Sequence, residues 1–186
     1  MIARGFITEW AESVPWINMH QVEQDLVIGR VLIAIYSDKF LAERLAFRGG
    51  TAIYRLYLKP QARYSEDIDL VQIISEPIGP TLDRLRKVLS FLGEPSTSRK
   101  TSNNTMIFKI QSTFPPEVSM KLKIEINCKE HFAVLGYKKI NYEIKSTWFS
   151  GSNELISFDL NELLGTKLRA LYQRRKGRDL FDLYFC

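Results

Sequence analysis

The chain has 186 residues, of which 45% are hydrophobic and 25% are charged, a composition typical of one globular core with room for a small helical appendage. Its net charge of +5 permits an acidic partner such as a nucleotide or RNA without requiring one. Two cysteines give neither a disulfide framework nor metal-ligand spacing, and two isolated histidines argue against a histidine-centred catalytic or zinc site. With no secretory signal and no apolar run long enough to span a bilayer, we expect a cytoplasmic protein that makes no use of a membrane.

Hydrophobic periodicity and turn residues divide the chain into helices and strands. The expected helices, two of them N-capped by Asn18 and Ser37, lie at residues 6–14, 18–34, 37–44, 51–58, 82–92, 160–174 and 179–185. The expected strands lie at residues 45–47, 68–74, 106–112, 120–127 and 137–146. The polar residues 94–104 are expected to form a surface loop.

This arrangement predicts an α+β fold, with a mixed central sheet flanked by helices. We expect residues 1–150 to form a core with N-terminal helices, and residues 151–186 to form a helical C-terminal segment that completes the functional site. The apolar face of helix 160–174 is expected to comprise Leu160, Leu163, Leu164, Leu168 and Leu171.

A glycine pair, Gly49-Gly50, lies between an expected strand and an expected helix. Glycine leaves the backbone open to a phosphate group, and amides at a helix N-terminus attract anions. A lone glycine pair is more often a simple turn, so this feature gains meaning only from its neighbours.

Two aspartates, Asp67 and Asp69, open the next expected strand. Residues at i and i+2 of a strand point to the same face, about 6.6 Å apart along the backbone at roughly 3.3 Å per residue. Two carboxylates that converge repel each other unless a cation lies between them. Beside a phosphate cradle, such a pair indicates Mg²⁺-assisted phosphoryl or nucleotidyl transfer, although a lone Asp-x-Asp usually marks a solvated strand end.

A third carboxylate, which would hold a second metal ion or activate an attacking hydroxyl, is expected at Glu125. It lies on the polar face of strand 120–127, opposite the apolar face of Leu122, Ile124 and Ile126. The alternative is that Glu125 only pairs with Lys123 or Lys121 on a wet sheet face.

A cationic stripe runs along the C-terminal helix, where Lys167, Leu171, Arg174 and Arg178 follow helical spacing if Gly177 does not break it. Lysine as a point charge and arginine as a bidentate fork suit a triphosphate. On spacing alone, a solvated basic helix end that complements the helix dipole is the favoured interpretation. Asp179 could likewise cap the last helix or pair with a nearby arginine.

Two separated segments resemble one known family. F-R-G-G-T-A-I at 47–53 with R-Y-S-E-D-I-D-L at 63–70, and later R-D-L-F-D-L at 178–183, resemble the signatures of the AbiEii-type nucleotidyltransferase toxins, a branch of the polymerase-β-like nucleotidyltransferase superfamily. The family often continues with more helical sequence, so by comparison this chain is expected to be short or truncated.

The resemblance implies a nucleotidyltransferase fold and transfer of NMP from an NTP to an acceptor hydroxyl. It implies one or two Mg²⁺ ions, tRNA as the acceptor, and a toxin with a cognate antitoxin. With the residue patterns above, the expected catalytic residues are Asp67, Asp69, Glu125, Lys167 and Asp179, of which Lys167 and Asp179 are added by the resemblance; the expected metal ligands are Asp67, Asp69 and Glu125. The expected nucleotide-binding residues are Gly49, Gly50, Thr51, Arg63, Ser65, Lys167 and Arg174, of which Arg63 and Ser65 either bind phosphate or only fix the loop.

Two alternatives stay open. The acceptor could be a small molecule or a protein hydroxyl, or the chain could be a non-catalytic nucleotide-binding or interaction module. A P-loop NTPase is disfavoured, because the sequence contains no G-x-x-x-x-G-K-[ST].

Overall fold

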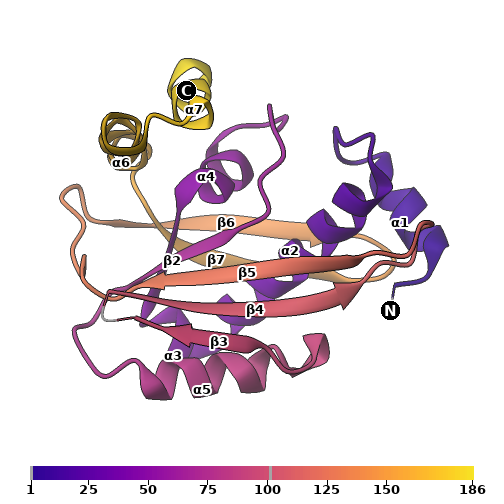
Figure 1. Cartoon of the computed structure of the whole chain (residues 1–186), viewed down its shortest axis with the longest axis horizontal. Coiled ribbons are helices and arrows are strands. Elements are labelled where there is room, and N and C mark those ends of the chain that lie inside the picture. Colours follow the sequence, from indigo (N-terminus) through magenta and orange to yellow (C-terminus); the bar gives the residue numbers. More distant parts are fainter. Residues whose placement is uncertain (1, 101) are drawn as a thin grey trace.

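A mixed sheet of seven strands lies at the centre of the computed structural model, which describes residues 2–100 and 102–186 (Figure 1). The strand order across the sheet is β3-β4-β5-β2-β1-β7-β6. Two neighbouring pairs, β1 with β7 and β2 with β5, are parallel, and the other four pairs are antiparallel. The strands are β1 (Leu45–Arg48), β2 (Ile68–Gln72), β3 (Ser96–Arg99), β4 (Asn103–Gln111), β5 (Ser119–Asn127), β6 (Tyr137–Lys145) and β7 (Ser150–Phe158).

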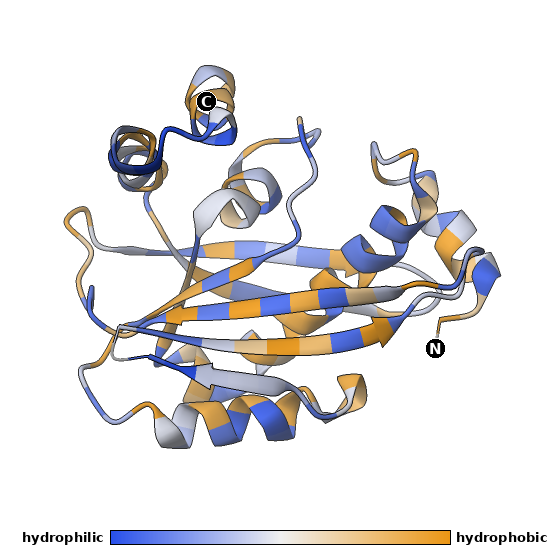
Figure 2. Ribbon diagram, in the orientation of Figure 1, coloured by the Kyte–Doolittle hydropathy of each residue, from blue (hydrophilic) through white to orange (hydrophobic). Residues whose placement is uncertain are grey.

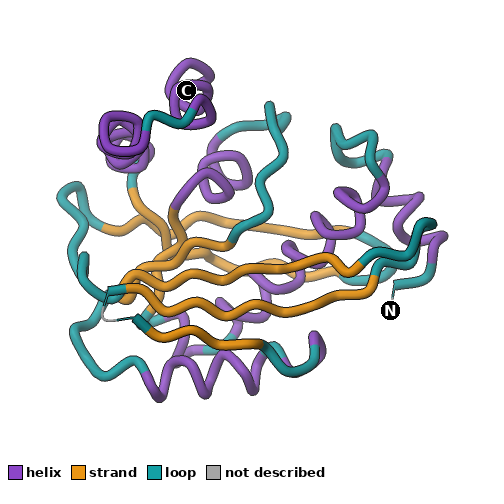
Figure 3. The backbone as a smooth tube through the Cα atoms, in the orientation of Figure 1, coloured by secondary structure: helices purple, strands orange, loops and turns teal. Residues whose placement is uncertain are grey.

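Helices lie on both sides of this sheet (Figures 1 and 3). The α-helices are α1 (Arg4–Ala11), α2 (Met19–Ser37), α3 (Lys39–Ala42), α4 (Gly49–Ala52), α5 (Gly79–Val88), α6 (Leu160–Arg174) and α7 (Gly177–Phe185). Two short segments extend α4 and α5: a π-helical turn at Ile53–Tyr57 and a 3-10 turn at Ser90–Leu92. Helix α2 packs against β5, β6 and β7, whereas α4, α6 and α7 gather at the other side of the sheet.

Strand β5 shows why the sheet has one apolar and one polar face. Leu122, Ile124 and Ile126 are fully buried, as their alternation predicts, and the residues between them face outward. Figure 2 shows hydrophilic and hydrophobic residues alternating along the neighbouring strands as well. The predicted α+β class with a mixed, helix-flanked sheet is therefore confirmed. Within the described residues, none of the helices is both long and apolar enough to cross a membrane.

The prediction of a loop at 94–104 was wrong. Residues Ser96–Arg99 form edge strand β3, which pairs antiparallel with β4, and β4 itself begins at Asn103. An edge strand can be polar throughout, because its ladder hydrogen bonds run to one neighbour and water solvates the rest. Hydropathy alone therefore did not separate this strand from a loop.

Strand β7 was also absent from the sequence prediction. It starts with the polar run S-G-S-N-E and only its last residues are buried, yet it pairs with both β1 and β6. Because β7 belongs to the same sheet as the residues before it, we propose that the helical C-terminal segment begins at Asp159, not at residue 151.

Three local details differ from expectation. Asp38, not Ser37, caps the short helix α3, accepting a hydrogen bond from the Leu41 amide. Leu168 is 61% exposed, so it does not belong to the buried face of α6. Helix α6 ends at Arg174, because Arg175 has a left-handed φ of +51°. The predicted cationic stripe therefore lies on two helices, α6 and α7.

Candidate active site

The glycine pair stands where β1 runs into α4, and both glycines are needed there. Gly49 has a φ of +81°, and a Cβ at this position would lie 2.2 Å from Oδ2 of Asp69. A Cβ on Gly50 would lie 2.7 Å from Nη2 of Arg63 and 3.4 Å from both Nζ of Lys167 and Oγ of Ser65. The backbone at this point is thus bordered by a carboxylate on one side and by cationic and hydroxyl groups on the other.

Thr51, the next residue, fastens the loop that carries the aspartates. Its hydroxyl lies 2.8 Å from Oγ of Ser65 and donates to the carbonyl oxygen of Asp67 at 2.5 Å. Thr51 is 1% exposed, so these bonds are shielded from water. The loop before β2 is held against the start of α4 by these contacts.

The carboxylates come from two adjacent strands. In the parallel pairing of β2 with β5, Asp69 stands opposite Glu125, so their side chains share one face of the sheet. Burial, followed by the negative charges of Asp67 and Glu125, raises the pKa of Asp69 above its usual range. Glu125 accepts a hydrogen bond from Nδ2 of Asn103 at 3.1 Å and pairs with Nζ of Lys123 at 2.5 Å.

This arrangement bears on the expected metal. In the described part of the chain, no three His, Cys, Asp or Glu side chains form a group that could hold a metal ion. Neither Asp67 nor Asp69 has an ion-pair partner there, whereas Glu125 is paired with Lys123. Mg²⁺ is commonly held by one or two carboxylates, with water and substrate phosphates as its other ligands. Two unneutralised carboxylates fit such an ion, with Glu125 as the less available third oxygen donor.

A network of buried charges joins α6 and α7 to the loop before β2. Nζ of Lys167 lies 2.8 Å from Oδ2 of Asp182 and 3.3 Å from Oδ1 of Asp179. Arg63 donates two hydrogen bonds to Asp182, at 2.6 and 2.8 Å, and Arg174 donates two to Asp179, both at 2.7 Å. Both aspartates are 0% exposed, so the network is stable only because every charge in it is paired.

The same network lowers the pKa of both aspartates. For Asp179, the hydrogen bonds from Arg174 are the main cause. For Asp182, burial alone would raise the pKa, but hydrogen bonds from Arg63 and Lys167 outweigh it. Both side chains therefore remain ionised at neutral pH and fix the cations around them.

One cavity of about 350 Å³ brings most of these residues together. Its walls combine the glycine pair, the three carboxylates and the cations of α6 and α7. Of the expected site residues it is lined by Gly49, Gly50, Arg63, Ser65, Asp67, Asp69, Glu125, Lys167 and Arg174. Thr51 and Asp179 do not line it, although Asp179 contacts Lys167 and Arg174, which do.

Sequence reasoning missed several residues of the site. Asp182 stands three residues after Asp179 in the R-D-x-x-D-L segment, and helical spacing could have placed both on one face. Arg48 and Arg169, which also line the cavity, share Glu130 at 2.8 and 2.7 Å. No local sequence pattern indicates these two ion pairs, because Arg48, Glu130 and Arg169 lie on three separate segments.

The chain is similar to known proteins in sequence and in fold. A family model described as "Nucleotidyl transferase AbiEii toxin, Type IV TA system" matches residues 30–186. No curated protein matches the sequence.

Among solved structures, the nucleotidyltransferase toxin MenT4 (Rv2826c) from Mycobacterium tuberculosis H37Rv is similar, with 16% identity, a TM-score of 0.69, and coverage of 98% of this chain and 63% of that one. JHP933 from Helicobacter pylori gives 19% identity, a TM-score of 0.66, and coverage of 91% and 67%. An antigenic nucleotidyltransferase-like protein from Paracoccidioides brasiliensis has 18% identity and a TM-score of 0.53, and the match covers 87% of this chain and 74% of that one. These likenesses confirm the predicted nucleotidyltransferase fold, and the chain spans roughly two thirds of the length of the first two structures.

Proposed function

The chain belongs to the AbiEii family of nucleotidyltransferase toxins, and on that premise we propose that it transfers a nucleoside monophosphate from an NTP to a hydroxyl group of RNA, with tRNA as the acceptor. The observation that carries this proposal is the single cavity in which two unneutralised carboxylates face a cluster of cations. Carboxylates on one wall and cations on the other suit a metal-bound triphosphate.

Asp67 and Asp69 are the proposed ligands of one or two Mg²⁺ ions. Bound there, Mg²⁺ would neutralise phosphate charge that develops as the α-phosphate bond breaks. The raised pKa of Asp69 supports this assignment: burial is its main cause, and the negative charges of Asp67 and Glu125, which raise it further, would be offset by a bound cation.

The proposed reaction is an in-line displacement at the α-phosphorus. The acceptor hydroxyl oxygen forms a new bond to the α-phosphorus, and the bond from that phosphorus to the bridging oxygen of the β-phosphate breaks. Pyrophosphate leaves with the electron pair of the broken bond. Glu125 is the proposed acceptor of the hydroxyl proton, and Lys123, 2.5 Å from its Oε2, holds that carboxylate in place.

The triphosphate is proposed to lie on the glycine pair, with Lys167 and Arg174 neutralising its charge. Lys167 is 7% exposed and held by two aspartates, so it is preorganised at the floor of the cavity. Asp179, which does not line the cavity, is proposed as a positioning residue for Lys167 and Arg174. Arg63 is proposed chiefly to fix the loop, since both of its donor groups next to Asp182 are already used.

The family further suggests a toxin whose activity a cognate antitoxin controls, acting in the cytoplasm. The net charge of +5 is compatible with an RNA acceptor. Transfer to a small molecule or to a protein, or nucleotide binding without transfer, remain the rival functions and are separated by the following experiment.

Purified protein is incubated with Mg²⁺, each α-labelled NTP in turn, and either total tRNA or no added acceptor. The proposal expects label on tRNA with the unmodified protein and none with Asp67→Ala, whose fold is checked by thermal unfolding. Label on the protein itself or on a small molecule would contradict the RNA acceptor. NTP binding without transfer to any acceptor would contradict the enzyme.

A further inference from the structure

Two further hollows continue from the active-site cavity along the surface. The first, of about 420 Å³, shares lining residues with that cavity, and the second, of about 650 Å³, shares lining residues with the first. The residues common to the cavity and the first hollow are Arg63, Ser65, Asp67 and Arg178. Those common to the two hollows are His20, Gln21 and Tyr64. We call these two hollows together the lateral groove.

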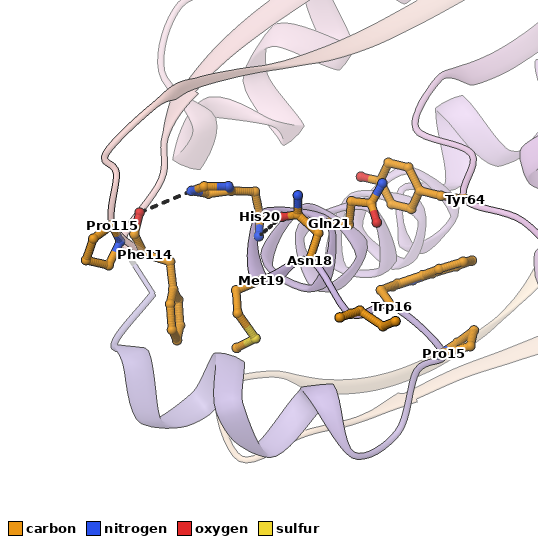
Figure 4. A pocket seen from close by; sticks show the side chains of 10 residues that line it. Pro15, Trp16, Asn18, Met19, His20, Gln21, Tyr64, Phe114 and Pro115 are labelled. Atoms are coloured by element: carbon orange, nitrogen blue, oxygen red, sulfur yellow. Dashed lines mark hydrogen bonds between the residues drawn. The ribbon is translucent and has the colours of Figure 1, made fainter.

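The outer end of the lateral groove contains aromatic side chains that are fixed in place (Figure 4). The rings of Trp16 and Tyr64 pack edge to face, with centroids 5.3 Å apart and planes at 80°. The indole N–H of Trp16 donates to Oδ1 of Asp25 at 3.1 Å, and Asp25 is 1% exposed and paired with Arg55 at 2.8 Å. This part of the wall is therefore rigid before any ligand arrives, as a stacking platform for a flat ring must be.

Polar side chains stand beside this aromatic wall. His20 and Gln21 line both hollows, next to Tyr64. An aromatic surface with polar groups beside it suits a flat ring that carries hydrogen-bonding edges, which describes a nucleobase.

Exposed lysines lie on two strands close to the groove. Lys109 on β4 and Lys121 on β5 stand directly opposite each other, both are exposed, and neither has an ion-pair partner in the described part of the chain. Like charges in such a pair destabilise a sheet, so a polyanion lying across them would relieve a cost of the free protein. Gln24 donates to the carbonyl oxygen of Lys121 at 3.0 Å, which joins the groove wall to this strand.

From these features we infer that the lateral groove and the Lys109–Lys121 pair bind the unpaired 3′ end of an RNA acceptor. A base stacks beside Trp16, backbone phosphates lie over the two lysines, and the terminal hydroxyl reaches Glu125. This inference rests on the proposed nucleotidyl transfer to RNA. The triphosphate is assigned to the neighbouring cavity, because the glycine pair and Lys167 line that cavity and do not line the groove.

The test is a binding titration without NTP, using a fluorescent single-stranded RNA with a 3′-hydroxyl and the same RNA with abasic nucleotides at its 3′ end. Trp16→Leu is compared with Trp10→Leu, because Trp10 also donates its indole N–H to Asp25 at 3.1 Å but does not line the groove. Loss of one stacked base, worth about 1–3 kcal/mol, predicts a Kd roughly 5- to 150-fold higher for Trp16→Leu. Trp10→Leu should stay close to the unmodified protein, and the abasic RNA should bind that protein as weakly as ordinary RNA binds Trp16→Leu.

The lysines are tested by salt dependence. The double variant Lys109→Gln/Lys121→Gln should reduce the slope of log K against log salt by about 1.4, since each phosphate contact on a single strand contributes about 0.7. The control Lys139→Gln/Lys145→Gln, on β6, should leave the slope unchanged.

Several results would overturn the inference. Equal Kd values for the two tryptophan variants, or equal binding of ordinary and abasic RNA by the unmodified protein, would exclude a stacked base. If Trp16→Leu changed only the KM for NTP, the groove would bind the base of the NTP instead of an RNA base. The abasic comparison needs no variant, so it decides even if Trp16→Leu does not fold. Because binding is measured without turnover, the two proposals can fail separately. RNA binding that depends on Trp16, with no label transfer in the NTP assay, would contradict the proposed function but support RNA binding in the groove.

Discussion

Replacing Gly49 with alanine should disable the site through one defined displacement. The new Cβ would lie 2.2 Å from Oδ2 of Asp69, so the carboxylate must move by about 1 Å to reach an ordinary contact distance. A misplacement of about 1 Å can lower catalysis by about 100-fold. The left-handed backbone, with a φ of +81°, adds a stability cost of about 1–3 kcal/mol for a residue with a side chain.

Gly93 provides the matched control. Its φ is +83°, but a Cβ there would have nothing within 4 Å. Gly93→Ala therefore carries the backbone cost without the displaced carboxylate. Urea unfolding should show a loss of stability in both variants, and label transfer should fall only in Gly49→Ala. Transfer by Gly49→Ala within a few-fold of the Gly93→Ala rate would refute the reasoning that Asp69 must occupy its observed position.

Three further outcomes are expected. Asp182→Asn should cost about 3–5 kcal/mol of folding stability at neutral pH, because it leaves buried cations unpaired. The pKa of Asp182 is lowered in the folded state, so its ionised side chain stabilises the fold fully above its unfolded pKa of about 3.9, and this stabilisation is lost as the pH falls through the folded pKa. In urea titrations at acid pH, the stability difference between Asp182→Asn and the unmodified protein should therefore vanish. A difference that persists in acid would contradict the pairing. Mg²⁺ at about 100 times its Kd should stabilise the protein by about 2.7 kcal/mol, reversibly with a chelator; Asp69→Asn should lose this effect, and an unchanged effect would place the ion elsewhere. Arg174→Gln should raise the KM for NTP by about 10-fold or more through loss of a charge-assisted contact, whereas the neighbouring Arg175→Gln, outside the cavity, should not; equal effects would point to general surface charge.

Local patterns predicted the parts of the site that lie close together in sequence. The glycine pair and the alternating Asp67 and Asp69 are separated by one helix and one loop, and periodicity placed both at element ends. The cationic stripe was visible as helical spacing, even though α6 ends at Arg174 and Arg175 is left-handed. These features depend on backbone geometry that neighbouring residues determine.

Other features depend on contacts between distant residues. Arg63 meets Asp182 across 119 positions, and no local pattern indicates that the arginine is held by a buried aspartate. Trp16 and Tyr64 meet only because α2 passes beside the loop before β2. Strands β3 and β7 were missed for a related reason, since hydrogen bonds to neighbouring strands stabilise polar segments that hydropathy cannot distinguish from loops.

The position of the label decides whether the site performs nucleotidyl transfer. The purified protein is given Mg²⁺, tRNA, and the same NTP labelled either at the α-phosphate or at the γ-phosphate. Attack at the α-phosphorus predicts that α label remains on the RNA while γ label leaves in pyrophosphate, and that Asp69→Asn abolishes both signals. Label from the γ position on the RNA, or α label released as free NMP with none on any acceptor, would contradict the proposed function of the cavity.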